Sequence, residues 1–460
     1  MLNGWRDRMS SCNHCMAKNM SFMIYLKETF KYLLRCPLVI SKYIKQVENL
    51  YTLSHDELHS YGEERFLKIF RKAWDKSSFY QQLCRLKGIG RNDIQHLEDI
   101  KRLPVLTKDM LKAHGTYLLT QCNLGLIKSH TSGTTGTPLT VYKDWPALWR
   151  EQAYLYCYRK RCGYTYGEPL VSLRGNLSKA QLSLKVHVSN TLYLSSYNIN
   201  INTATRYFQL IKKHHPKAIE GYPSSLYSLA LVFREKQLEC HIPLAFTSSE
   251  NLYDYQRDLI EKTFHTQVFD HYGATERTIS LEEDFNHDGY FESPGYGIEE
   301  YYDDYIITTS LINDVFPLIR YRIEDRVVLK SDARSNEGDL VLGQGVKSLN
   351  GRAASFLVGK DGTMYGDASL TFIFRDTPEV QFAQFIQEKP GRVILNIVVG
   401  QSFDQDSKDR LLSNIDKKMG LSNMNVEIHE VDRQQLKYSS RGKLALIVSD
   451  VPLLTTVRNP

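Results

Sequence analysis

The sequence contains no run of about 20 apolar residues, the length that a membrane-spanning helix needs. Its N-terminus also lacks the unbroken apolar segment and small-residue cleavage site of a secretion signal. There are no internal repeats, and the 42% hydrophobic and 24% charged content excludes collagen-like, coiled-coil and wholly disordered classes. These absences predict a soluble, cytoplasmic protein whose 460 residues can bury a large core.

Cysteine is absent after Cys240, and all eight cysteines lie between Cys12 and that residue. In a large chain without a secretion signal, this distribution predicts reduced thiols. The spacing Cys12-Asn13-His14-Cys15 could begin a zinc site, but no second Cys or His pair follows at a ligand-like distance. We therefore predict no metal site built from cysteine.

The first 50 residues carry eight Lys or Arg against three Asp or Glu. Solvated helix faces explain such a surplus; so does contact with an anionic membrane, which would place the protein at the inner face of the membrane. Five of the nine Met fall within the first 23 residues, so translation could begin at Met20 or Met23. Residues 1–23 are accordingly predicted to be disordered or to precede the true start.

Hydrophobic spacing changes along the chain. Apolar residues recur at helical spacing through residues 24–90, and Thr107 can cap a helix that follows Pro104. From about residue 127 to 330, short apolar runs alternate with amphipathic stretches, which is typical of an α/β sheet domain.

After residue 350 a strand, a helix and a strand are predicted at 393–399, 407–419 and 425–431, which indicates a small α+β domain. The predicted fold class is therefore α/β. A large N-terminal domain over residues 24–350 has helices packed on β-sheets, and a small α+β C-terminal domain covers residues 353–460.

The strongest local signal is Ser129-His130-Thr131-Ser132-Gly133-Thr134-Thr135-Gly136-Thr137-Pro138, in which six hydroxyl residues accompany two glycines. Glycines let a turn expose several backbone N–H groups in one direction, and the hydroxyls add donors, so the loop can surround phosphate oxygens. It is not a Walker A loop, because the Gly-Lys-Ser/Thr ending is missing. A flexible Ser/Thr/Gly linker is the alternative, although linkers do not usually separate apolar segments inside a domain.

This loop resembles the phosphate-binding loop of the adenylate-forming superfamily, which includes acyl-CoA synthetases and luciferases. Further matches follow in the family's order. Tyr272-Gly273-Ala274-Thr275-Glu276 resembles its Tyr-Gly-x-Thr-Glu motif, and Tyr321-Arg322-Ile323-Glu324-Asp325 its Tyr-Arg-Thr-Gly-Asp motif. Gly351-Arg352 resembles its hinge, and Gly442-Lys443 its terminal lysine.

Finer features resemble one branch, the phenylacetate–CoA ligase family, and within it the members that act in capsular polysaccharide biosynthesis. They are the segments 78–80, 103–108, 221–225 and 317–322. Apart from the first ~20 residues, the resemblance covers nearly the whole chain.

The resemblance implies an enzyme that joins a carboxylate to ATP, releases pyrophosphate and leaves an acyl-AMP. The cofactors it implies are ATP and Mg²⁺, because repulsion between the carboxylate and the triphosphate must be screened. Glu276 would carry the Mg²⁺. Thr275 would bind the α-phosphate, and Lys443 would stabilise charge at the α-phosphate and acyl carboxylate from the small domain.

The remaining nucleotide contacts are also implied by the resemblance. Tyr272 and Gly273 would lie against adenine with Ser249 and Glu250, and Asp325 would accept the ribose hydroxyls near the hinge residue Arg352. The loop residues that would bind the β- and γ-phosphates are Thr131, Ser132, Gly133, Thr134, Thr135 and Gly136. Taken singly, Glu276, Asp325 and Lys443 could be ordinary surface charges; the ordered set favours the functional interpretation.

The substrate pocket is predicted near Tyr222, Ser248, His271 and Gly273. Asp270 and His271 invite a general-base interpretation, but packing beside the pocket is the simpler role for His271. Ser224 is not in a Gly-x-Ser-x-Gly elbow, so it is not expected to be a nucleophile.

Three positions depart from the family pattern. Thr137 stands where many members have Lys, Glu324 replaces the usual Gly, and no Asp follows Gly351-Arg352 as it commonly does in CoA ligases. The residues that the resemblance assigns to adenylation are all present, whereas the hinge residues do not support the use of coenzyme A. We therefore predict transfer of the acyl group to an amine or hydroxyl acceptor, for instance on a sugar; the acid could instead be a hexuronate, giving an amide.

Two alternatives stay open. One is a conventional aryl- or acyl-CoA ligase of the phenylacetate type, and the other is a catalytically silent scaffold in a polysaccharide assembly complex. A small-molecule acid and its acceptor are the expected partners, without nucleic acid, and the resemblance makes a homodimer reasonable.

Overall fold

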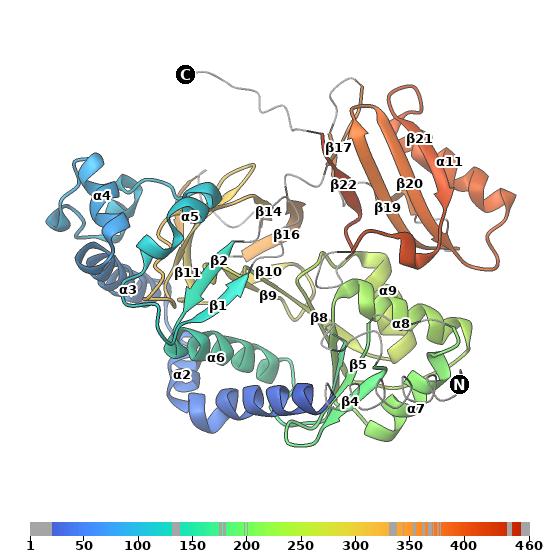
Figure 1. Cartoon of the computed structure of the whole chain (residues 1–460), viewed down its shortest axis with the longest axis horizontal. Helices are drawn as coiled ribbons and strands as arrows, with labels where there is room; N and C mark the ends of the chain where they lie inside the picture. The colour runs from blue at the N-terminus through green and yellow to red at the C-terminus, as the bar shows by residue number, and fades with distance from the viewer. Residues whose placement is uncertain are drawn as a thin grey trace, which may run out of the picture. The chain divides into compact units, whose positions relative to one another are not determined.

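The computed structural model describes residues 21–130, 139–173, 177, 181–196, 198–199, 201–330, 338–343, 345–352, 356–360, 364–366, 370, 372–374, 377, 379–438 and 444–451 (Figure 1). The chain divides into two compact units. The first comprises residues 1–299, 308–321 and 340–344, and the second comprises residues 300–307, 322–339 and 345–460. The predicted α/β class is confirmed, because each unit combines sheets with helices.

Helices open the first unit, as the spacing of apolar residues predicts. Residues 21–35 are helical, so the described structure begins inside the segment 1–23. Three further helices follow, α2 (Pro37–Leu50), α3 (His55–Lys76) and α4 (Ser78–Leu86). Ser54 caps α3 in a capping box with Glu57, which satisfies backbone donors at the first turn. Buried Phe66, Ile69, Phe70 and Ala73 form the inner face of α3.

The main sheet of the first unit contains eight strands in the order β10-β9-β8-β7-β6-β3-β5-β4. The five strands β5, β3, β6, β7 and β8 are parallel, and the flanking strands β4, β9 and β10 are antiparallel to their neighbours. Their bounds are β3 (Leu170–Leu173), β4 (Ser183–Val186), β5 (Thr191–Leu194), β6 (Ala218–Gly221), β7 (Leu244–Ser248), β8 (Gln267–Gly273), β9 (Ser280–Glu283) and β10 (Tyr290–Glu292).

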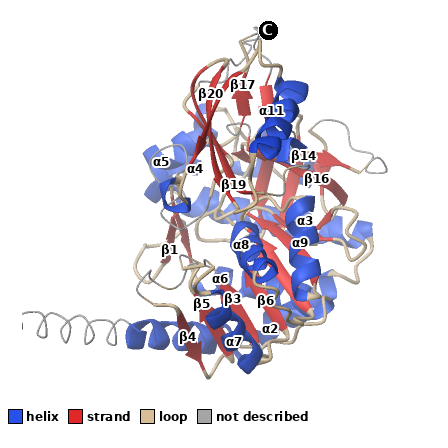
Figure 2. Ribbon diagram, turned by 90° about the vertical axis from the view of Figure 1, so that its right-hand side faces the viewer, coloured by secondary structure: helices blue, strands red, loops and turns tan. Residues whose placement is uncertain are grey.

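Crossover helices connect the parallel strands. The chain passes from β5 to β6, β7 and β8 in one direction across the sheet, and right-handed crossovers place successive helices on the same face. The helices α7 (Ala204–His214), α8 (Pro223–Glu235) and α9 (Asp254–Phe264) accordingly lie together on one face (Figure 2). Helix α6 (Trp145–Arg161) lies on the other face and packs against α2.

Smaller elements lie outside the main sheet. Strands β1 (Ile127–His130) and β2 (Thr140–Lys143) pair antiparallel on either side of residues 131–138. Thr107 caps α5 (Lys108–His114), as predicted. A four-stranded sheet runs in the order β13-β12-β11-β15, with bounds β11 (Gly297–Tyr301), β12 (Ile306–Ser310), β13 (Tyr321–Ile323) and β15 (Leu340–Val341). Short 3₁₀ helices occur at Arg91–Asp93, Leu97–Arg102 and Gly115–Leu118.

The second unit contains the α+β arrangement that the sequence predicts after residue 350. Helix α11 (Gln405–Met419) packs on a sheet of order β21-β20-β19-β22, and its buried face contributes Leu411, Ile415 and Met419 to the core. The strands are β19 (Val380–Lys389), β20 (Arg392–Val399), β21 (Asn425–Glu430) and β22 (Ile447–Ser449). Two further antiparallel pairs are β14 (Asp325–Leu329) with β16 (Gly345–Arg352), and β17 (Phe356–Val358) with β18 (Met364–Gly366). The 3₁₀ helices are Phe372–Phe374 and Arg433–Gln435.

Two findings concern the cysteines and the helices in the described part of the chain. The six cysteines placed there are all free thiols. Among the described helices, none is long and apolar enough to cross a membrane. The spacing Cys12–Cys15 lies outside the described residues.

Candidate functional site

The segments that follow β6, β7 and β8 lie at one edge of the main sheet, because the carboxyl ends of parallel strands share an edge. Ser248 is the last residue of β7 and pairs in register with His271 of β8. Two residues beyond β7, the Glu250 carboxylate accepts a hydrogen bond of 3.1 Å from the backbone N–H of Ser224, at the start of α8. The structure therefore brings together residues that the sequence assigns to nucleotide and substrate.

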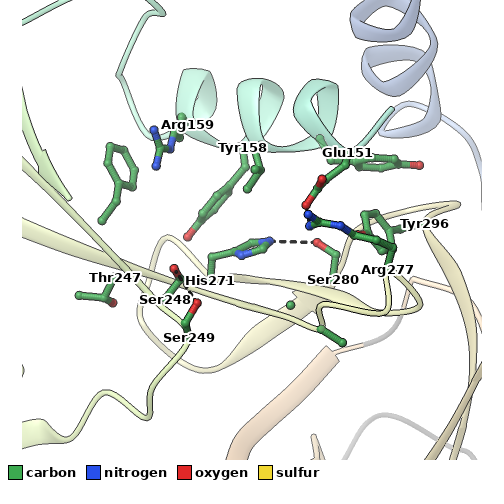
Figure 3. Close-up of a pocket in the computed structure, with 15 residues that line it drawn as sticks. Glu151, Tyr158, Arg159, Thr247, Ser248, Ser249, His271, Arg277, Ser280 and Tyr296 are labelled. Atoms are coloured by element: carbon green, nitrogen blue, oxygen red, sulfur yellow. Dashed lines mark hydrogen bonds and ion pairs between the residues drawn. The ribbon is translucent and has the colours of Figure 1, made fainter. Parts of the chain in front are cut away.

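A cavity of about 140 Å³ lies between this edge and helix α6 (Figure 3). Four predicted residues line it: Ser248, Ser249, His271 and Gly273. Helix α6 supplies the opposite wall through positions spaced by three and four residues, which share one helix face; these are Glu151, Tyr154, Leu155, Tyr158 and Arg159. Tyr222 is buried at the end of β6 and is not among the described residues that line the cavity.

The Tyr272–Glu276 motif forms the end of β8 and the turn beyond it. The Glu276 carboxylate is partly buried and accepts a hydrogen bond of 3.2 Å from the Tyr321 hydroxyl. Two non-glycine residues at the strand ends have left-handed backbone angles, Ser249 with φ 72° and Arg277 with φ 63°. Such conformations cost energy and concentrate at functional sites, where the surrounding structure holds them in place.

His271 is held by a buried chain of hydrogen bonds. Its Nε2 lies 3.0 Å from the Ser280 hydroxyl, which lies 2.8 Å from the Ser293 hydroxyl, and Ser293 donates to Glu282 at 2.8 Å. As a carboxylate, Glu282 only accepts, so Ser293 must accept from Ser280, and Ser280 from His271. Neutral His271 is thereby fixed as the Nε2–H tautomer, and its other ring nitrogen is an acceptor.

Two ion pairs involve side chains of the α6 wall of the cavity. Glu151 pairs with Arg277, which follows the Tyr272–Glu276 motif directly. Arg159 pairs with Glu220 of β6, whose second oxygen accepts a hydrogen bond of 2.9 Å from Ser172. Sequence reasoning missed Glu151 and Arg277. Arg277 could have been found from its place after the motif, but nothing local identifies Glu151.

Asp270, the neighbour of His271, is a structural carboxylate. It is buried and accepts hydrogen bonds from the Thr247 hydroxyl at 2.5 Å and the Tyr290 hydroxyl at 2.8 Å. Burial raises the pKa of Asp270, and these two hydrogen bonds oppose the rise. Because both oxygens are engaged and the side chain does not line the described cavity, the geometry does not support a general-base role.

Lys143, the last residue of β2, is a buried cation near the cavity wall. Burial and the positive charges of Arg277 and Arg35 lower the pKa of Lys143 to about 7. The unfolded chain keeps this lysine protonated up to its ordinary pKa, so between these values the unfolded state binds the extra proton and stability rises with pH.

We therefore expect the unfolding free energy of the wild type, relative to Lys143→Met, to increase by about 1–2 kcal/mol between pH 7 and pH 9. Urea unfolding at several pH values measures this difference. The exposed Lys42→Met variant is the control, and its difference from the wild type should stay constant. If the difference in unfolding free energy between the wild type and Lys143→Met does not change with pH, the lowered pKa is contradicted.

Other predicted site residues lie in the second unit or outside the described residues. Asp325 opens β14 and stands directly opposite Arg352 of β16 in the antiparallel register. The phosphate-loop residues 131–136 lie outside the described residues, between β1 and β2, and so does Lys443. The chain around Lys443 is anchored by a β-bridge between Tyr438 and Leu444. Roles for all of these residues stay predictions.

The fold is that of the adenylate-forming CoA ligases. The crystal structure of 2-hydroxyisobutyryl-CoA ligase in the postadenylation state, in complex with 2-HIB-AMP, matches with a TM-score of 0.67 at 16% identity, over 86% of this chain and 90% of that chain. A structure of the same ligase in complex with R3-HIB-AMP gives a TM-score of 0.66 at 16% identity, over 87% and 91%.

Sequence comparison identifies relatives of this chain within that fold. The chain is homologous to Protein CapK of Staphylococcus aureus, with 24% identity over 369 residues, 76% of this chain and 81% of that protein. Residues 357–450 match the family described as the CapK C-terminal domain. A shorter match of 28% identity over 95 residues, 20% of this chain and 21% of the relative, is to phenylacetate-coenzyme A ligase of Thermus thermophilus. The resemblance drawn from the motifs is confirmed.

Proposed function

We propose that this chain is an ATP-dependent, AMP-forming ligase. It activates a carboxylic acid as an acyl-AMP and passes the acyl group to an amine or hydroxyl acceptor in surface or capsular polysaccharide biosynthesis. The observation that carries the proposal is the Tyr272–Glu276 turn, which borders a cavity at the carboxyl edge of the sheet in an adenylate-forming fold. Homology to CapK supports the link to capsule biosynthesis.

In the adenylation step, the carboxylate of the acid must approach the triphosphate of ATP, and both are anions. A carboxylate is a poor electrophile until one of its oxygens becomes part of a good leaving group, which AMP provides. Glu276 would hold Mg²⁺, and the metal would screen the negative charge of the triphosphate. The residue fits this role because a carboxylate supplies the oxygen ligands that a hard cation such as Mg²⁺ prefers.

Different residues of the chain would bind the nucleotide and stabilise the transition state. Thr275 would orient the α-phosphate, Asp325 would bind the ribose, and Lys443 would stabilise the charge that develops between carboxylate and α-phosphate. The cavity beside His271 would hold the acid, with its carboxylate at the strand edge. A CoA ligase is the second candidate, and the fold shared with 2-hydroxyisobutyryl-CoA ligase favours it.

ATP–pyrophosphate exchange tests the adenylation step directly, because it needs no acceptor. Purified protein is incubated with ATP, Mg²⁺ and one acid at a time from a panel of aryl, fatty, amino and hydroxylated acids. Exchange with one class supports the proposal. Hydroxylamine trapping with and without coenzyme A then separates the two candidates, and a thioester as the main product would contradict the amine or hydroxyl acceptor.

We also infer that helix 21–35 binds the surface of an anionic membrane. Its apolar side chains Phe22, Met23, Leu26, Phe30 and Leu33 are exposed, Met23 by 67%. At 3.6 residues per turn these five positions span an arc of about 100°, so they form one apolar face. The exposed cation Lys27 lies on the same helix next to this face, and Lys31, which pairs with Glu28, follows one turn later; both can contact anionic headgroups.

Sedimentation with vesicles tests this inference. We expect the protein to bind phosphatidylcholine vesicles that contain phosphatidylserine, and Phe22→Ser with Phe30→Ser to reduce binding at least tenfold, because two apolar anchors are lost. Leu124→Ser removes an even more exposed apolar residue elsewhere and should bind as the wild type does. Equal binding by the double variant and wild type would contradict the inference, as would self-association through this face.

A further inference from the structure

The wall of the cavity between α6 and the strand edge carries charged and hydroxyl groups beside its aromatic side chains. Pockets for apolar ligands are lined mainly by hydrophobic side chains, with a few polar groups that fix orientation. Here an ion pair between Glu151 and Arg277 lies in the wall (Figure 3). The hydroxyls of Ser248, Ser249 and Ser280 add polar groups along the strand side.

Within the described part of the chain, the ion pair has hydrogen-bonding capacity left over. Glu151 is 5% exposed, and its Oε1 pairs with Arg277 while its buried Oε2 has no hydrogen-bond partner there. Arg277 pairs through Nη1, and its buried Nε has no acceptor there. Buried polar atoms without partners are costly and rare in folded proteins, so each calls for an explanation.

The two atoms make different demands on an occupant. Glu151 Oε2 needs a donor, and Arg277 Nε needs an acceptor. A hydroxyl group can satisfy both, because it donates one proton and keeps two lone pairs. An ammonium group can only donate, and a second carboxylate can only accept, so each of these satisfies one atom and leaves the other unpaired.

His271 extends this polar character toward the reacting edge. Its Nε2–H is committed to Ser280, and the chain through Ser293 to Glu282 holds the imidazole in one tautomer. The rings of Tyr154 and Tyr296, with centroids 5.1 Å apart, supply apolar surface in the same wall. Hydroxyl-binding groups beside aromatic faces suit a carbon skeleton that carries hydroxyls.

The size of the cavity limits the acid. A water-sized group occupies about 10–15 Å³ on this measure, so 140 Å³ holds on the order of ten such groups. An acid of three to six carbons with hydroxyl substituents is of this order, whereas long-chain fatty acids are too large.

We propose that the acid activated at this site is a small hydroxylated carboxylic acid, a hydroxy acid or sugar acid, whose hydroxyl bridges Glu151 and Arg277. The proposal rests on the proposed adenylation, and it names the substrate class. Glu151 and Arg277 are then specificity-determining residues that recognise the substituent while the carboxylate reacts at the strand edge.

The experiment compares acids that differ in one group. Glycerate, lactate and glucuronate are matched with propionate and butyrate, with alanine and serine, and with benzoate and phenylacetate. ATP–pyrophosphate exchange gives kcat/KM for each acid, and calorimetry with α,β-methylene-ATP gives its Kd without turnover. We expect a hydroxylated acid to have a kcat/KM at least tenfold higher, and a Kd at least tenfold lower, than its deoxy counterpart, because a site built to bind a hydroxyl rejects an analogue that lacks it.

Variants assign the preference to the ion pair. Glu151→Leu should reduce kcat/KM for the preferred hydroxy acid at least tenfold and improve that for butyrate, and Glu151→Gln should have an intermediate effect. Glu48→Gln is the matched control, since it removes an exposed ion pair with Lys160 at the other end of α6 and should keep the wild-type preference.

The outcomes separate the two proposals. Exchange that favours aryl, alkyl or amino acids overturns the substrate class and leaves adenylation standing. Preferential binding of a hydroxy acid without exchange supports the class and contradicts the ligase. Absence of a hydroxy-acid preference in both measurements, or a preference that survives Glu151→Leu, overturns the inference.

Discussion

Replacing Lys443 by alanine will lower the rate of ATP–pyrophosphate exchange by about 10²–10³-fold, the loss measured when one preorganised group that stabilises transition-state charge is removed. The physical reason is that charge accumulates where the acid's carboxylate meets the α-phosphate, and a cation aimed at that point stabilises the transition state more than the bound substrates. The loss should fall on kcat more than on the KM for the acid, because an interaction that strengthens in the transition state lowers the rate of the chemical step when it is removed.

The anchors on either side of Lys443 make a matched control available. Lys437, six residues earlier, is exposed, and the backbone on both sides is tied to Gln384, whose amide donates to the carbonyl oxygens of Lys437 and Ala445. Lys437→Ala removes the same charge from the same segment without touching these bonds, and its exchange rate should stay within twofold of the wild type. Equal activity of the two variants would exclude Lys443 from the adenylation step.

Local patterns predicted the elements that local interactions determine. The apolar spacing of the segment 24–90 predicts the helices seen there, and the hydroxyl of Thr107 caps α5 because the cap depends on residues three apart. The strand predicted at 393–399 is β20, and the helix at 407–419 is α11. The motif residues Ser248, His271 and Gly273 lie together because they end adjacent parallel strands.

The sequence could not predict the contacts that define what the cavity binds. Glu151 and Arg277 are far apart in the chain, and their pairing depends on how α6 packs beneath the sheet. The same is true of Asp270, whose position beside His271 invites a catalytic role. Only the structure reveals that hydroxyls from β7 and β10 occupy its oxygens. Packing between distant elements is not encoded in periodicity or in short motifs.

Replacing Glu282 by alanine will lower the unfolding free energy by about 3 kcal/mol, the lower end of the range for breaking a buried ion pair, because Arg161 is partly exposed and can be rehydrated. Glu282 is buried in β9, accepts hydrogen bonds from Tyr51 at 2.5 Å and Ser293 at 2.8 Å, and pairs with Arg161 at the end of α6. One carboxylate thus connects the end of α2, the end of α6 and the sheet. Its loss leaves three donors without an acceptor and a small void.

Urea unfolding compares how much the buried network around Glu282 and an exposed ion pair each contribute to stability. Glu48→Ala removes an exposed ion pair with Lys160 in the same helical layer and should change stability by less than about 1 kcal/mol. Glu282→Gln keeps an acceptor for Tyr51 and Ser293, so it should lie between the two. If Glu282→Ala unfolds at the same urea concentration as Glu48→Ala, the buried network does not stabilise this unit.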